Sequence, residues 1–177
     1  MKTFSNCFRT RRADRVGLPR TVLLKRISNE LQMCSGYIGC DIQFDPSSAE
    51  FPLEITVNMS NVPAFAKIDG TVTQIKDHRY KVIINEEYPY EKPKARWETP
   101  IYHPNIMPPE DGGYVCIKLL DIWDFGSTLL SFMKAVENLV FNPNPLNPFG
   151  MELCVEASKF YLDNESKINA SVSSGRS

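Results

Sequence analysis

A proline-rich stretch in the middle of the chain is the strongest constraint on how this sequence can fold. Six of the 13 prolines lie between residues 88 and 109: Pro89, Pro93, Pro100, Pro104, Pro108 and Pro109. Proline fixes its own φ angle and has no backbone N–H, so this stretch excludes long regular structure. Four aromatic residues along it are available to hold it by packing: Tyr88, Tyr90, Trp97 and Tyr102. Because long ordered loops in compact domains are commonly functional, we expect an irregular, ordered loop that carries a site.

The residues before this loop predict one amphipathic helix followed by four strands. Pro19 opens the helix, which ends before Gly36, and its apolar residues recur at helical spacing: Val22, Leu23, Ile27 and Leu31. Apolar, β-branched or alternating runs predict strands over residues 37–44, 53–59, 71–76 and 79–85. Turns are expected at Ile68-Asp69-Gly70 and at Asp77-His78. Strands joined in this way favour an antiparallel meander.

Two helices are expected after the loop. Ser127 or Thr128 is a suitable N-cap, and a wide apolar stripe typical of a buried central helix follows: Leu129, Phe132, Met133, Val136, Leu139 and Val140. Asn142-Pro143-Asn144-Pro145 ends that helix, and a last helix is predicted from about Phe149 to Asn164. The prediction is an α+β fold with a flexible arm over 1–18, one domain over 19–165 and a disordered tail over 166–177.

Composition and charge exclude several classes of protein. The 177 residues suit one domain, with 42% hydrophobic and 23% charged residues. A net charge of -1 gives no electrostatic drive toward nucleic acid or anionic membrane, and no apolar run is long enough for a span. The basic start has no continuous apolar region of the kind found in secretory signals; a transit peptide is the alternative. We expect a cytoplasmic protein without nucleic-acid or membrane partners.

The cysteine and histidine content predicts neither a disulfide framework nor a metal site. There are five widely spaced cysteines and two histidines, with no CxxC pair. No cofactor is expected either. Four of the cysteines are interpreted as ordinary small side chains in the arm, a helix end, a strand and a helix core: Cys7, Cys34, Cys40 and Cys154.

Three features after the loop converge on one kind of chemistry. Tyr102-His103-Pro104-Asn105 is followed by Cys116 within Val115-Cys116-Ile117, and Trp123 and the Asn142–Pro145 corner come next. The segments IYHPNI, VCIKLL, the tryptophan and NPNPLNP resemble the ubiquitin-conjugating enzyme family. YPYEKP and LLKRISNELQ resemble that family's proline loop and first helix, so the resemblance covers about residues 19–160. It implies a UBC-like fold with an irregular active-site loop between the strands and the central helix.

The resemblance implies an E2-type conjugating enzyme in which Cys116 is catalytic. The cysteine would accept ubiquitin or a ubiquitin-like modifier from an E1 activating enzyme as a thioester and pass it to a lysine of a protein substrate. Transfer between similar thiols is nearly balanced in energy, so no base has to sit beside Cys116. Attack by the lysine builds negative charge on a carbonyl oxygen. The resemblance assigns to Asn105 either the stabilisation of that oxygen or the bracing of the loop that forms the site.

Further residues are expected to support the active site by analogy with the family: His103, Pro104, Lys118, Trp123 and Asn147. His103 is interpreted as holding the loop rather than acting as a general base. Asn147 stands where the family often has an acidic residue. The segment between Asn105 and Cys116 is about three residues longer than in the family by the resemblance. Glu110 and Asp111 on it are candidates to replace the missing acid.

Two surfaces are candidate contacts with other proteins. The resemblance implies that Arg20, Lys25 and Arg26 on the first helix meet the activating enzyme, the alternative being a plain solvated face. Tyr90 and Phe125 match loop positions that contact activating enzymes and RING-type ligases in the family, the alternative being simple packing.

Two other functions remain open for this sequence. A non-catalytic relative would bind a modifier protein without carrying it, although such variants lack the active cysteine. A cysteine hydrolase would pair Cys116 with His103 and would need a third residue to orient the histidine.

Overall fold

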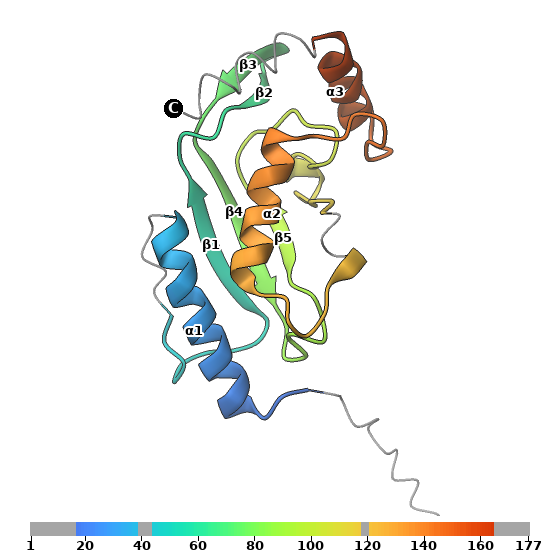
Figure 1. The fold of residues 1–177 in the computed structure, drawn as a ribbon. Coiled ribbons are helices and arrows are strands. Elements are labelled where there is room, and N and C mark those ends of the chain that lie inside the picture. Colours follow the sequence, from blue (N-terminus) through green and yellow to red (C-terminus); the bar gives the residue numbers. More distant parts are fainter. Residues whose placement is uncertain (1–16, 39–43, 118–120, 165–177) are drawn as a thin grey trace, which may run out of the picture.

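The computed structural model describes residues 17–38, 44–117 and 121–164. Its elements follow the chain in the order α1 (Arg20–Ile38), β1 (Leu53–Met59), β2 (Ala64–Ile68), β3 (Thr71–Ile75), β4 (His78–Ile84), β5 (Lys94–Trp97), the 3-10 turn η1 (Pro109–Asp111), α2 (Leu129–Phe141) and α3 (Glu152–Asp163). Figure 1 shows a strand layer with α1 and α2 beside it and α3 at one end. The predicted α+β class is confirmed.

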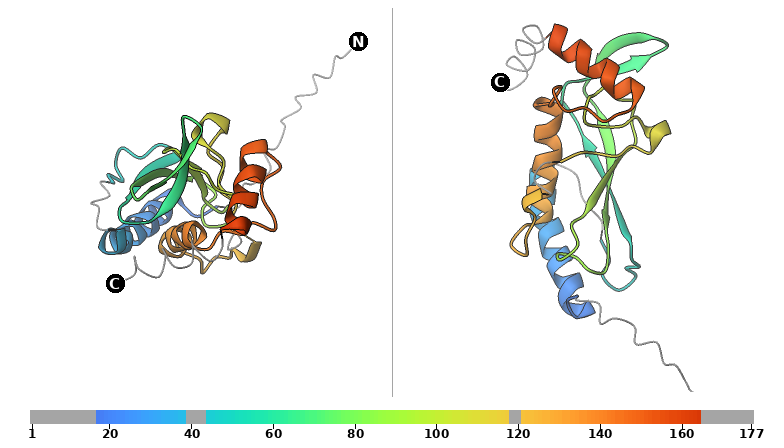
Figure 2. Two further views of the ribbon diagram at one scale, coloured as in Figure 1. Left: turned by 90° about the horizontal axis from the view of Figure 1, so that it is seen from above. Right: turned by 90° about the vertical axis from the view of Figure 1, so that its right-hand side faces the viewer.

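A three-stranded antiparallel sheet in the order β1-β4-β5 forms the centre of the fold. Leu53 pairs with Ile84 at one end of the β1–β4 ladder, and Tyr80 pairs with Trp97 in the β4–β5 ladder. Side chains alternate between buried and exposed along β1 and β4, so one face of the sheet is covered. Helices α1 and α2 lie side by side on that face (Figure 2), and the core lies between them and the sheet.

The strand order differs from the predicted four-stranded meander. Strands β2 and β3 form a hairpin of their own, and β1 pairs directly with β4. The predicted turn at Asp69-Gly70 is confirmed, with φ angles of 48° and 78°. The second predicted turn is wrong, since His78 begins β4 as a buried residue whose Nε2 bonds to the Val62 carbonyl at 2.9 Å.

Several boundaries also depart from the prediction. Helix α1 continues through Gly36 to Ile38, so the predicted strand over 37–44 begins inside a helix, and residues 39–43 lie outside the described part. Strands β2 and β5 were not predicted, and β5 lies within the proline-rich stretch. Helix α3 begins at Glu152 rather than Phe149. The arm before Gly17 and the tail after Asn164 lie outside the described residues, so their flexibility stays a prediction.

Helix α2 begins where its sequence places the cap. Thr128 has an extended backbone and accepts from the backbone N–H of Ser131, while the Ser131 hydroxyl accepts from the backbone N–H of Thr128. This reciprocal pair satisfies two of the free donors at the helix start. The predicted stripe is buried at its centre, where Leu129, Phe132 and Val136 have no exposed surface. Within the described ranges, no helix is long and apolar enough to cross a membrane.

Candidate active site

An open groove of about 830 Å³ lies beside Cys116. One wall comes from α2, another from the segments around Cys116 and Asp121, and a third from the corner after α2. Its lining residues are Asn105, Cys116, Ile117, Asp121, Ile122, Ala135, Asn138, Leu139, Asn142, Asn144 and Asn147. Three of the predicted site residues therefore share this groove: Cys116, Asn105 and Asn147.

Cys116 is exposed and is held by its backbone rather than by its thiol. Its N–H donates to the carbonyl of Asn105 at 3.0 Å, and the neighbouring Val115 bridges to Ile106. In the described part of the chain, no hydrogen bond or ion pair of the Cys116 sulfur is found, in keeping with a thiol that needs no adjacent base. The backbone pairing fixes where the thiol faces the groove.

The side-chain amide of Asn105 is committed to the corner after α2. Its Nδ2 donates to the carbonyls of Asn144 at 3.1 Å and Asn147 at 2.9 Å, and its Oδ1 accepts from the N–H of Asn144 at 2.7 Å. A primary amide has two N–H donors, and both are used. The geometry therefore favours the bracing role for Asn105 over direct donation to a reacting oxygen.

His103 lies behind the groove and is fully engaged. Its Nδ1 accepts from the N–H of Asn105 at 3.0 Å, and its Nε2 lies 3.2 Å from the Leu139 carbonyl, to which it donates. Only 1% of the residue is exposed. Burial, partly opposed by the bond to Leu139, lowers the pKa of His103 to about 3. The imidazole is thus neutral, and it joins Asn105 to α2 as the loop-holding interpretation predicts.

The long segment between Asn105 and Cys116 folds back onto the sheet. It makes the η1 turn, and the carbonyl of Gly113 accepts from the N–H of Trp97 at 2.7 Å. Gly113 has a φ of 62°, and a Cβ there would lie 2.3 Å from the Trp97 carbonyl oxygen, so only glycine fits. Glu110 and Asp111 do not line the groove. Their predicted role as replacements for the missing acid gains no support.

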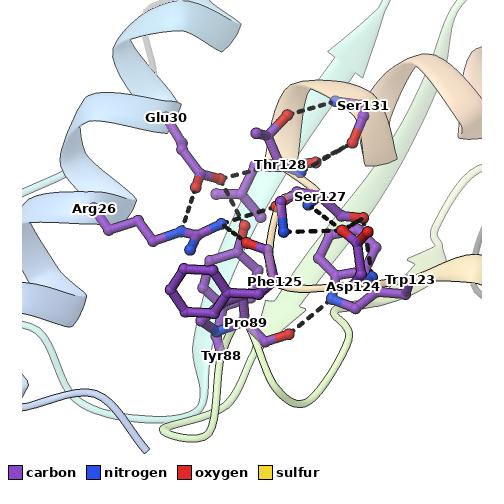
Figure 3. A network of polar contacts seen from close by, with 12 residues as sticks. Arg26, Glu30, Tyr88, Pro89, Trp123, Asp124, Phe125, Ser127, Thr128 and Ser131 are labelled. Carbon is purple, nitrogen blue, oxygen red and sulfur yellow. Dashed lines mark hydrogen bonds and ion pairs between the residues drawn. The ribbon is translucent and has the colours of Figure 1, made fainter.

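A buried carboxylate joins α1 to the start of α2 (Figure 3). Glu30 is 5% exposed; its Oε2 accepts from the Tyr88 hydroxyl at 2.6 Å and from the N–H of Leu129 at 2.8 Å. Its Oε1 accepts from the Nε of Arg26 at 2.7 Å. A negative charge at the first N–H groups of α2 is favourable. Burial and the bond to Glu30 raise the pKa of Tyr88, which stays a neutral donor.

Arg26 extends this network to the segment before α2. Its Nη2 donates to the carbonyls of Phe125 and Ser127, both at 2.9 Å, and its guanidinium lies 4.8 Å from the Phe125 ring centre. Trp123 belongs to the same region rather than to the groove, since its Nε1 donates to the Pro89 carbonyl at 2.8 Å. We name these residues the Glu30 clamp: Arg26, Glu30, Tyr88, Trp123, Phe125 and Ser127 (Figure 3).

The residues predicted to contact other proteins differ in exposure and in their bonds within the chain. Tyr90 and Phe125 are both 52% exposed and lie together, with ring centres 5.5 Å apart. On α1, Arg20 and Lys25 are exposed and Arg26 is half-buried. Arg20 bonds to the Ala49 carbonyl and lies over Phe51, and Arg26 is bound in the clamp.

Sequence reasoning missed two acidic residues. Glu30 follows Arg26 by four residues, which indicates a helix-surface ion pair but gives no sign of burial. Asp121 lies in the groove, but it falls between the VCIKLL segment and Trp123, so no motif singled it out. Pro104 is buried behind the groove, and Lys118 lies outside the described residues.

Comparison with known proteins agrees with these features. Residues 46–172 match the family model described as "Ubiquitin-conjugating enzyme". The chain is 32% identical over 83 residues to the human "Ubiquitin-conjugating enzyme E2 T", covering 44% of this chain and 41% of that protein. It is 33% identical over 93 residues to "Ubiquitin-conjugating enzyme E2 21" of Caenorhabditis elegans, covering 51% and 42%. The matched part thus spans about two fifths of the length of these curated relatives.

A solved structure resembles the fold as a whole. The E2 domain of a ubiquitin conjugating enzyme of Toxoplasma gondii aligns with a TM-score of 0.57 and 20% identity, covering 89% of this chain and 94% of that chain. This likeness shows the fold. The resemblance drawn from the sequence motifs is confirmed by the match over residues 46–172.

Proposed function

Because the chain belongs to the ubiquitin-conjugating enzyme family, we propose that Cys116 carries ubiquitin or a related modifier as a thioester and passes it to a lysine. An activating enzyme supplies the modifier, and lysine-bearing proteins, helped by a RING-type ligase, receive it. The observation that carries this proposal is the position of Cys116: an exposed thiol at the edge of a groove that is open to a second protein.

The chemistry of both transfers is consistent with these surroundings. In charging, the Cys116 thiolate attacks the thioester carbonyl on the activating enzyme; a new C–S bond forms, the old one breaks, and the departing thiolate takes up a proton. In discharge, a neutral lysine amine attacks the Cys116 thioester, a C–N bond forms and the C–S bond breaks. Neither transfer needs a histidine base next to the sulfur.

Asn105 supports this proposal as a brace. Its amide holds the corner that carries Asn144 and Asn147, and its own carbonyl receives the N–H of Cys116. The brace therefore sets the distance between the thiol and the far wall of the groove. An enzyme that orients a second reactant needs a wall of fixed position.

The bonds of His103 disfavour the alternative in which the protein is a cysteine hydrolase. Both ring nitrogens of His103 are bonded elsewhere, and the ring is buried. It therefore cannot take a proton from Cys116. A modifier-binding scaffold without catalysis is the other alternative, and the presence of an exposed cysteine in the groove argues against it.

Charging can be tested on gels. The protein is incubated with ATP, ubiquitin and the ubiquitin-activating enzyme, then with other modifiers and their own activating enzymes. We expect an adduct that disappears on reduction, a more stable ester for Cys116→Ser and no adduct for Cys116→Ala. Cys154→Ala is the matched control, because Cys154 is buried in α3 and should not affect charging. Charging of Cys116→Ala would contradict the assignment.

A further inference from the structure

The corner after α2 depends on hydrogen-bond donors from other parts of the chain. Three of the residues over 142–148 have no N–H to donate, because they are prolines: Pro143, Pro145 and Pro148. Within this described stretch, one bond joins two of its own backbone groups, from the N–H of Asn147 to the carbonyl of Asn144, and it is long at 3.3 Å. Since the corner forms one wall of the groove that Cys116 also lines, these outside donors fix the position of that wall.

Asn105 supplies two of those donors, and Ser158 supplies a third. The side-chain N–H groups of Asn105 bind the carbonyls of Asn144 and Asn147. The hydroxyl of Ser158 on α3 donates to the carbonyl of Pro145, which lies between these two in the sequence, at 2.6 Å. Ser158 therefore holds the same short stretch as Asn105, but from a different element of the fold.

Ser158 gives its hydroxyl to the corner and not to its own helix. A serine inside a helix commonly bonds the carbonyl four residues earlier or points to solvent. Ser158 is only 6% exposed, and its bond reaches a residue 13 positions earlier in the chain. A hydroxyl has a single proton to donate, so this bond uses its whole donor capacity.

Helix α3 is itself anchored to the loop that carries Asn105. The centre of the Phe160 ring lies 5.6 Å from that of Tyr102. The centre of the Tyr161 ring lies 5.7 Å from that of His103. The active-site loop, α3 and the corner are therefore joined pairwise, and the Ser158 hydroxyl is a polar link between α3 and the corner.

We propose that Ser158 is a positioning residue for the transfer reaction: by holding the Pro145 carbonyl, it sets the distance between the corner and the thioester on Cys116. This inference rests on the proposed thioester chemistry at Cys116. Ser158 takes up no proton and forms no covalent bond during transfer, because it acts only through the corner. A displacement of that wall by about 1 Å spoils the orientation of the attacking amine, and so lowers the rate of its reaction.

The experiment measures the order of the corner and the rate of transfer separately. Hydrogen exchange of the uncharged protein follows Asn147 and Phe149, whose backbone N–H groups are both hydrogen-bonded. For transfer, the protein is charged with whichever modifier loads it, beginning with ubiquitin, and further activation is stopped by removing ATP. The thioester is then followed with increasing free L-lysine or with hydroxylamine, a small nucleophile that has no side chain to be oriented.

Three variants separate the position of the corner from overall stability. Ser158→Ala removes the donor, and Ser158→Thr keeps a hydroxyl. Ile55→Val deletes one methyl group on the buried side of β1 and is the matched control, because it lowers stability without touching the corner. Urea unfolding measures the stability that each variant loses, so the comparison of Ser158→Ala with Ile55→Val tests the inference.

For Ser158→Ala we expect kcat for discharge to lysine to fall about fivefold while KM changes less than about twofold, because orientation is lost rather than binding. The rate of charging and discharge to hydroxylamine should stay close to wild type. Exchange at Asn147 and Phe149 should become faster. Ser158→Thr should recover most of the lysine rate, and Ile55→Val should match wild type in discharge and in exchange at the corner.

Other results would overturn the inference in distinct ways. Unchanged discharge in Ser158→Ala, whether or not exchange is faster, removes Ser158 from the reaction while leaving the thioester function intact. Slowing of Ser158→Ala and Ile55→Val in proportion to their loss of stability would reduce the role of Ser158 to stability alone. Equal slowing with lysine and hydroxylamine would place the effect on the thioester itself. A chain that no modifier charges overturns the proposed function, and the exchange result still reports whether Ser158 holds the corner.

Discussion

At the scale of single residues, Asn105 and His103 show how the site is fixed from behind. Each uses all of its polar groups on backbone partners, and neither has a donor left for the reacting carbonyl. The sequence predicted both residues as members of the site and left two roles open for Asn105. The pairing with the carbonyls of residues 144 and 147 favours bracing, and no local pattern encodes that pairing, which spans about 40 residues of chain.

The bracing role of Asn105 predicts a loss of stability. Asn105→Asp replaces both donors by acceptors that face carbonyl oxygens, so the free energy of unfolding should fall by about 1–3 kcal/mol. Discharge to lysine should slow as the corner loosens. Urea unfolding gives the stability, and Asn147→Ala is the control, because it keeps the backbone carbonyl that Asn105 uses. Full stability with lost discharge would instead indicate a direct role at the reacting oxygen.

The buried His103 predicts a pH dependence of stability. Its folded-state pKa of about 3 lies below the unfolded value, so the unfolded chain binds more protons between these two pKa values. Stability is therefore complete above about pH 6.5 and falls with decreasing pH, by up to about 1.4 kcal/mol per unit. His78, whose pKa burial also lowers, contributes in the same direction. Urea unfolding from pH 7.5 to 5 measures the slope, which His103→Gln should reduce; an equal slope would contradict the assignment.

At the scale of elements, α2 was predictable and the sheet was not. The N-cap and the apolar stripe of α2 are local signals, and the structure confirms both. The partner of β1 is β4, which is separated from it by the whole β2–β3 hairpin, and strand alternation does not say which strand pairs with which. Glu30 is a similar case. It occupies the polar side of an amphipathic pattern, and only its contacts with Tyr88 and Leu129 bury it.

From the Glu30 clamp we expect that replacing the Glu30 carboxylate by an uncharged amide destabilises the start of α2. Glu30→Gln leaves the Arg26 charge without its counter-ion and weakens the bonds to Tyr88 and Leu129, so unfolding should become easier by about 2–3 kcal/mol. Hydrogen exchange over residues 123–129 should speed up more than over β1. Glu50→Gln, at an exposed glutamate, is the control. Uniform acceleration of exchange, or none, would argue against a local clamp.

At the scale of the whole molecule, α3 connects the hairpin to the active-site corner. Phe160 packs on Phe65 of β2 with ring centres 5.1 Å apart, and Lys67 pairs with Glu156 at 2.6 Å. The Ser158 hydroxyl donates to the Pro145 carbonyl at 2.6 Å. The hairpin and α3 therefore support each other at one end of the molecule (Figure 1), away from the contact between α1 and α2.

Weaker packing of α3 should also affect the groove beside Cys116. Phe160→Ala removes ring contacts with Phe65 and Tyr102 and should lower the free energy of unfolding by about 2–3 kcal/mol. Exchange in α3 and the hairpin should rise, and lysine discharge should slow because Ser158 no longer holds Pro145 firmly. Val155→Ala, on the outer side of α3, is the control. If discharge is unchanged while α3 exchanges faster, the corner is independent of α3.

The attachment of α2 at both ends has a mechanical consequence. Glu30 and Arg26 hold its beginning, while His103 holds the carbonyl of Leu139 near its end. A helix of 13 residues is about 20 Å long and nearly incompressible along its axis. A tilt of the whole helix by about 3° about its start, next to Phe125, would move its end near Leu139 by about 1 Å. A displacement of that size matters for reacting groups. A partner that pushes on the exposed rings of Tyr90 and Phe125 would therefore shift the part of α2 that lies near Cys116, without unwinding the helix.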